Sequence, residues 1–182
     1  MRTLMIASVL VAACGGPADD LEEMVDTANA SAVPMAAPGA TATLRDSSGQ
    51  ELGTVTLSQV DRGIQVTGRV VGLLPGEHGI HLHTIGSCSP TFAAAGDHWN
   101  PTAREHGAEN PAGPHRGDLA NLQVDPDSSS MIDLVTPGGQ LEGAEGLLDV
   151  DGASVVIHAV GDDYRTDPDG AAGERVVCGV VR

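Results

Sequence analysis

The chain has 182 residues, of which 25 are acidic and nine basic, giving a formal net charge of −16. So acidic a surface repels phosphate groups and anionic lipid, which argues against nucleic acid as a partner. Hydrophobic residues make up 41% of the sequence and aromatic residues only 2%, so we expect one domain with an aliphatic core. The 24 glycines and 11 prolines argue against long helices and favour a turn-rich, mostly β chain.

Residues 1–13 have the pattern of an export signal. One arginine is followed by about ten apolar residues, too short a stretch to span a bilayer. The end of this stretch, VAAC at residues 11–14, resembles the lipobox of bacterial lipoproteins, whose cysteine becomes the lipidated first residue of the mature chain. We therefore expect export to the periplasm or outer cell envelope, with a lipid anchor at Cys14. An ordinary secretory signal is the alternative.

Residues 14–39 form the next segment, which begins with Cys14. The rest of it is acidic, rich in alanine, proline and glycine, and has no alternating apolar pattern. Such a composition does not supply enough apolar surface to fold by itself, so we expect a flexible tether. A short helix over residues 19–30 is the alternative.

From residue 40 the sequence changes to short segments in which apolar and polar residues alternate, separated by turn residues. This alternating pattern predicts β-strands. Many short strands without a helical period indicate an antiparallel sandwich or barrel. The eight expected strands are ATATLRD, ELGTVTLSQV, GIQVTGRVVG, GIHLH, LANLQVD, SMIDLV, ASVVIHAV and RVVCGVV.

The GIHLH segment places His81 and His83 two residues apart on an expected strand. Side chains at this spacing point to the same face, so the two imidazoles can converge on one point. Alone the pair is weak support for a site, because both rings could simply face solvent. A later strand adds His158, whereas His78 has no assigned role.

Residues 84–118 form a long segment without a strand pattern, and loops of this length are usually functional or disordered. The segment contains three histidines and an aspartate that together make a complete tetrahedral set for zinc. These residues are His98, His106, His115 and Asp118.

The chain has three cysteines. Cys14 has its own explanation in the lipobox-like motif, which leaves Cys88 and Cys178. In an exported protein these two are expected to form a disulfide. Two buried free thiols are the alternative.

Five motifs resemble, in order and in spacing, those of the copper, zinc superoxide dismutases over residues 40–182. They are GIHLH, GDHWNPTAREHG, PHRGDL, VVIHAVGDD and GERVVCGVV. The resemblance implies an eight-stranded antiparallel Greek-key β-barrel with a long metal-binding loop. It also implies a copper site formed by His81, His83, His98 and His158, and a zinc site formed by His98, His106, His115 and Asp118.

By the same resemblance, His98 bridges the two metals as an imidazolate, and redox-cycling copper converts superoxide to dioxygen and hydrogen peroxide. Arg175 guides the superoxide anion to the copper and is, with His98, the expected catalytic residue. Asp162 links His81 to His106 from behind the metals. A surface charge for Arg175 and an ordinary loop carboxylate for Asp162 are the alternatives.

Two other functions compete with an enzyme. A copper or zinc carrier could use the same barrel without catalysis, and a surface lipoprotein could retain only a relic of the site. Both predict that the anion-guiding arginine or part of the copper set is missing, yet His83, His98, His158 and Arg175 are all present. The sequence therefore favours an exported superoxide dismutase; it does not distinguish a monomer from a dimer.

Overall fold

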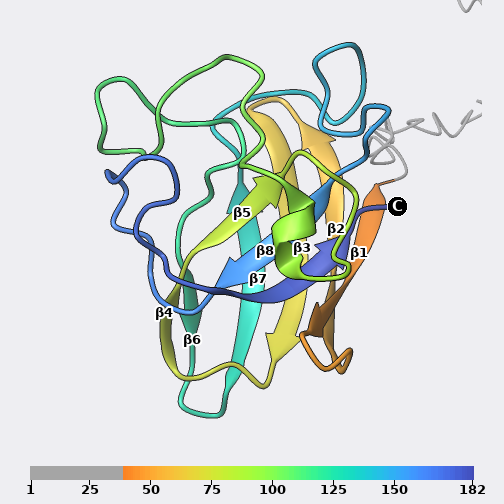
Figure 1. The fold of residues 1–182 in the computed structure, drawn as a ribbon, viewed down its shortest axis with the longest axis vertical. Helices are drawn as coiled ribbons and strands as arrows, with labels where there is room; N and C mark the ends of the chain where they lie inside the picture. Colours follow the sequence, from red (N-terminus) through yellow and green to blue (C-terminus); the bar gives the residue numbers. More distant parts are fainter. Residues whose placement is uncertain (1–38) are drawn as a thin grey trace, which may run out of the picture. The chain divides into compact units, whose positions relative to one another are not determined.

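The structure is a computed structural model that describes residues 39–182 (Figure 1). These residues form an all-β fold with one short 3-10 helix, η1, at Phe92–Ala95. Within this range, no helix has the length and apolar character needed to cross a membrane. The predicted export signal, Cys14 and the tether up to residue 38 lie outside the described residues.

Seven strands form one curled antiparallel sheet in the order β5-β8-β9-β1-β2-β3-β7, and β4 and β6 pair as a separate two-stranded sheet (Figure 1). Strands distant in sequence, such as β1 and β9, lie side by side, as in a Greek key. The strands are β1 (Ala40–Asp46), β2 (Glu51–Val60), β3 (Gly63–Val71), β4 (Gly76–His78), β5 (Ile80–His83), β6 (Leu122–Val124), β7 (Ser129–Val135), β8 (Ser154–His158) and β9 (Arg175–Val180).

The predicted all-β antiparallel class is confirmed, and each of the eight predicted segments contains a strand. The strand count was wrong, because residues 39–182 contain a ninth strand, β4. This strand is only three residues long and lies between Pro75 and Gly79, so it is too short to show an alternating pattern. It exists because its backbone pairs with β6.

The core is aliphatic, as the composition predicts. In β1, Ala40, Ala42 and Leu44 are buried while Thr41 is exposed, which is the alternation of a strand with one face on the core. Trp99 extends the core next to the metal-binding loop and packs on Gly139. A Cβ at position 139 would lie 2.3 Å from the Trp99 ring, so only glycine allows this contact.

Strand β5 lies at one edge of the sheet, and the 84–118 loop folds back along its free edge. The Leu82 amide donates to the Gly117 carbonyl at 2.9 Å, and the Trp99 amide donates to the Leu82 carbonyl at 2.8 Å. Backbone hydrogen bonds to the edge of β5 therefore fix a loop that has almost no regular structure of its own.

A disulfide joins Cys88 in this loop to Cys178 in β9, which confirms the predicted pairing. Cys178 is buried against Ala95 and Val156, and Cys88 and Phe92 pack on the same cluster. The bond therefore ties the beginning of the metal-binding loop to the strand that begins with Arg175.

Reduction of the disulfide should lower the free energy of unfolding by about 4 kcal/mol, because the oxidised bond restricts a loop of 90 residues in the unfolded chain. Urea unfolding of the metal-free protein, with and without reductant, measures this difference. The double variant Cys88→Ala, Cys178→Ala is the control and should not respond to reductant. Equal stability of the oxidised and reduced wild-type protein would contradict the prediction.

Candidate metal centre

Six of the seven histidines gather beside β5 and β8 with two buried aspartates. Strand β5 directs Ile80 and Leu82 into the core, so His81 and His83 face the other way, toward the loop. The loop brings the backbone of Asp118 opposite His81 and that of His98 opposite His83. Two overlapping groups of four residues result, with the potential ligand atoms of each within 4.8 Å of one another. They are His81, His83, His98 and His158, and His98, His106, His115 and Asp118.

The first group presents four buried ring nitrogens that have no hydrogen-bond partner. Within residues 39–182, the buried side-chain atoms without a partner are these four and Nδ1 of His106. Unsatisfied buried polar atoms are rare in folded proteins, and a metal ion is a partner that inward-facing imidazoles can share. The four atoms are His81 Nδ1, His83 Nε2, His98 Nε2 and His158 Nε2.

The other nitrogen of these rings is held by the surrounding chain. His83 Nδ1 donates to the Gly96 carbonyl at 3.0 Å, and His158 Nδ1 donates to the Gly173 carbonyl at 3.1 Å. A carbonyl only accepts, so these bonds place the proton on Nδ1 and leave the Nε2 lone pair free for a metal.

Burial keeps the rings of the first group neutral. It lowers the pKa of His81 to about 3, although the hydrogen bond that His81 donates to Asp162 acts in the opposite direction. Burial also lowers the pKa of His98 and of His158, and burial together with His98 lowers that of His83 well below its usual value. Neutral imidazole is the form that binds metals, so the group is ready to ligate at neutral pH.

The second group converges on Asp118. Its Oδ1 lies 2.9 Å from His98 Nδ1 and 3.2 Å from His115 Nδ1, and its Oδ2 lies 3.1 Å from His106 Nδ1. Burial alone would raise the pKa of Asp118, but the contacts with His106, His115 and His98 lower it far below its usual value. The result is one carboxylate among three imidazoles, the donor set that zinc prefers.

Asp162 joins the two groups from behind. Its carboxylate accepts a hydrogen bond from His81 Nε2 at 2.8 Å and another from His106 Nε2 at 3.0 Å. Burial alone would lower the pKa of His106, but the neighbouring carboxylates of Asp118 and Asp162 raise it to about 9. Gly170 makes room for this carboxylate, since a Cβ there would lie 2.1 Å from its Oδ1.

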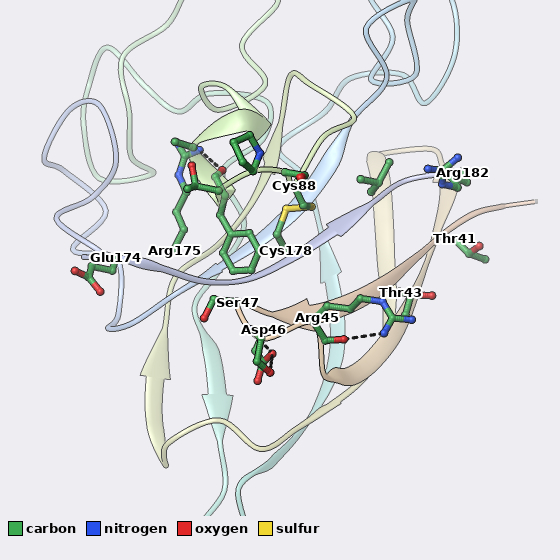
Figure 2. A pocket seen from close by; sticks show the side chains of 18 residues that line it. Thr41, Thr43, Arg45, Asp46, Ser47, Cys88, Glu174, Arg175, Cys178 and Arg182 are labelled. Atoms are coloured by element: carbon green, nitrogen blue, oxygen red, sulfur yellow. Dashed lines mark hydrogen bonds between the residues drawn. A yellow bond between two sulfur atoms is a disulfide. The ribbon is translucent and has the colours of Figure 1, made fainter.

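Arg175 begins β9 and pairs in register with His158 at a bulge between β8 and β9. Its half-buried guanidinium donates from Nη1 to the Phe92 carbonyl at 2.9 Å, and Figure 2 shows it on the same strand as Cys178 of the disulfide. Its positive charge contributes to the lowered pKa values of His83 and His158, after burial and the other contacts. The structure thus brings Arg175 to the first group.

His78 is a supporting residue that the sequence did not identify. It is buried, with Nδ1 lying 2.6 Å from the His158 carbonyl and Nε2 lying 2.8 Å from the Leu74 carbonyl. It therefore braces the backbone at His158. His78 lies an odd number of residues before both His81 and His83. On a continuous strand it would face the opposite side, so alternation alone could not place it with them.

A family model described as copper/zinc superoxide dismutase (SODC) matches residues 51–181. The chain belongs to the copper/zinc superoxide dismutase family. A Cu-Zn superoxide dismutase of Caulobacter vibrioides is 39% identical over 148 residues, 79% of this chain and 85% of that protein. A second Cu-Zn superoxide dismutase, from Deinococcus radiodurans, is 37% identical over 158 residues, 80% of this chain and 85% of that protein.

Solved structures agree with this family. The crystal structure of a superoxide dismutase-like protein from Bacillus subtilis matches with a TM-score of 0.74 and 36% identity, covering 77% of this chain and 96% of that one. The Cu/Zn superoxide dismutase from Brucella abortus matches with a TM-score of 0.64 and 29% identity, covering 79% and 99%. The protein is therefore an oxidoreductase of the superoxide dismutase type that uses copper and zinc.

Replacing Asp162 with alanine should weaken the binding of both metals by about 10- to 100-fold, because His81 and His106 both lose the acceptor that orients them. Competition with a chelator of known affinity measures the loss for copper and zinc separately. The matched control is Asp163→Ala, since Asp163 is exposed and, within residues 39–182, its carboxylate accepts hydrogen bonds only from Arg165 and Thr166. Equal metal affinities for the two variants would show that Asp162 does not orient the ligands.

Proposed function

We propose that the first group binds copper and the second binds zinc. Four imidazole nitrogens suit a copper ion that changes oxidation state, whereas three imidazoles and a carboxylate suit zinc. When bound, copper supplies one-electron oxidation and reduction, and zinc supplies a fixed positive charge. The observation that carries this assignment is the set of four buried nitrogens without partners, each on a ring of the first group.

We also propose that His98 serves both metals. Its Nε2 is unpaired and belongs to the first group, while its Nδ1 lies beside Asp118 in the second. A ring that binds a metal through both nitrogens carries no proton and is an imidazolate. Nε2 of His98 is then the atom at which this chain can take up and return a proton as superoxide is converted to dioxygen and hydrogen peroxide.

Arg175 is proposed to guide the substrate. Superoxide is a small anion, and a half-buried guanidinium held by the Phe92 carbonyl is a fixed cation beside the first group. A metal carrier built on the same barrel would not need such a cation. This distinction favours an enzyme over a carrier.

Superoxide consumption by the protein should require copper and should fall about ten-fold or more in kcat/KM in Arg175→Ala, because steering charges of this kind change association rates by about that factor. Pulse radiolysis of the copper- and zinc-loaded protein measures the decay of superoxide directly. Arg69→Ala removes an equal charge from an exposed position on β3 and should leave the rate unchanged.

The lower kcat/KM of Arg175→Ala should be found in protein that still holds its full content of copper. Elemental analysis of the same samples checks the copper content. If the loaded protein consumed superoxide no faster than the metal-free protein, the dismutase function would be refuted. The metal-carrier function would then be the better account.

We further propose that the enzyme works in the bacterial cell envelope, attached by a lipid at Cys14. Two features support this proposal. Residues 1–13 have the pattern of an export signal, and a lipobox-like VAAC motif stands at residues 11–14. The Cys88–Cys178 disulfide is of the kind that persists in oxidising compartments. Residues 14–39 would then be the tether between the lipid and the domain.

Mass spectrometry of the mature protein from a bacterial host should find Cys14 as the first residue, carrying a lipid. In Cys14→Ser the lipid should be absent and the protein should leave the membrane fraction. An unmodified N-terminus beyond Cys14 would instead indicate an ordinary secretory signal, and retention of residues 1–13 in the cytosol would refute export.

A further inference from the structure

The surface above the metal centre is a depression that reaches His98, His115 and Arg175. Six carboxylates line it, and we call them the acidic rim. All six side chains are exposed to solvent. The acidic rim consists of Asp97, Glu105, Glu145, Asp149, Asp167 and Asp169.

Few cations balance these charges. The chain has no lysine, and the depression contains only two arginines, Arg104 and Arg175. Within residues 39–182, the arginine ion pairs are Arg45 with Glu51 and Arg165 with Glu109, so no rim carboxylate is paired with an arginine. A rim carboxylate instead contacts an imidazole: within residues 39–182, His115 Nε2 lies 3.9 Å from Asp167 Oδ1.

The two arginines do not project freely toward an incoming anion. Arg104 donates from Nη2 to the Gly113 carbonyl at 2.6 Å, and Arg175 donates to the Phe92 carbonyl. Two rim carboxylates, Asp97 and Asp169, interact electrostatically with Arg175 and offset part of its charge. An approaching anion therefore meets exposed negative charge before it reaches the half-buried cation.

The charge of the whole chain adds to this local field, because the net charge is −16. At low ionic strength the screening length is about 30 Å, so both the rim and the distant charges act on a diffusing anion. Near physiological ionic strength the screening length falls to about 8 Å, and the repulsion is largely removed.

We propose that the acidic rim repels the substrate, and that Asp97 and Asp169 are the residues that most limit its approach to Arg175. This inference rests on the proposed function of the metal centre. The side chains of the loaded protein then act in two ways: Arg175 attracts superoxide at short range, beside the positive charge of the bound metals, and the acidic rim opposes the approach of anions at longer range. The rate of the enzyme should therefore increase with salt.

The test measures the copper- and zinc-loaded protein from about 10 mM to about 150 mM ionic strength in sodium perchlorate. In pulse radiolysis the wild-type kcat/KM should rise by about two-fold or more over this range. The double variant Asp97→Asn, Asp169→Asn should be faster than wild type at low salt and should depend less on salt. The control is Asp125→Asn, Asp127→Asn, which removes the same charge at the exposed turn between β6 and β7 and should keep the wild-type salt dependence.

Azide binding to the copper-loaded protein, followed by its absorbance, gives a second readout that needs no turnover. Azide affinity should increase with salt in the wild type and should be higher at low salt in Asp97→Asn, Asp169→Asn. If the protein showed these azide effects but consumed no superoxide, the repulsion by the acidic rim would be supported and the proposed function would be refuted. The inference would be overturned if both the rate and the azide affinity of the wild type fell with salt. It would also be overturned if the rim variant and the control variant behaved alike.

Discussion

The structure depends on one constraint: several neutral imidazoles are buried side by side with their lone pairs facing each other. Burial removes the charge from His81, His83, His98 and His158, and fixed acceptors behind three of these rings decide which nitrogen keeps its proton. Left alone, such an arrangement would bury polar atoms without partners. In the proposed sites, two metal ions would supply those partners, and metal binding would then stabilise the fold.

The barrel meets this constraint by combining rigid strands with a loop that is fixed at several points. Of the residues proposed to bind the metals, strand β5 supplies two and β8 supplies one, while the loop supplies the rest. The loop is held by ladder bonds to Leu82, by the packing of Trp99 in the core and by the Cys88–Cys178 bond to β9. The same disulfide lies on the strand that carries Arg175, so the attachment of the loop and the position of the cation are linked (Figure 2).

Much of this organisation is readable in the sequence, for physical reasons. The two-residue period of β5 indicates that His81 and His83 share a face, and the spacing of histidines in the long loop indicates a metal-binding set. The sequence does not predict the backbone groups and close contacts that hold the histidines in place, because these leave no pattern among the side chains. The Gly96 and Gly173 carbonyls, the space at Gly170, the brace at His78 and the short strand β4 all depend on segments that meet only in the folded chain.

We propose that two different metals occupy adjoining groups that share His98. X-ray diffraction from crystals of the loaded protein, collected at the copper and zinc absorption edges, tests it most directly. We expect a copper peak among His81, His83, His98 and His158, and a separate zinc peak among His98, His106, His115 and Asp118. A single peak, the same metal in both groups, or a His98 ring that contacts only one ion would contradict it.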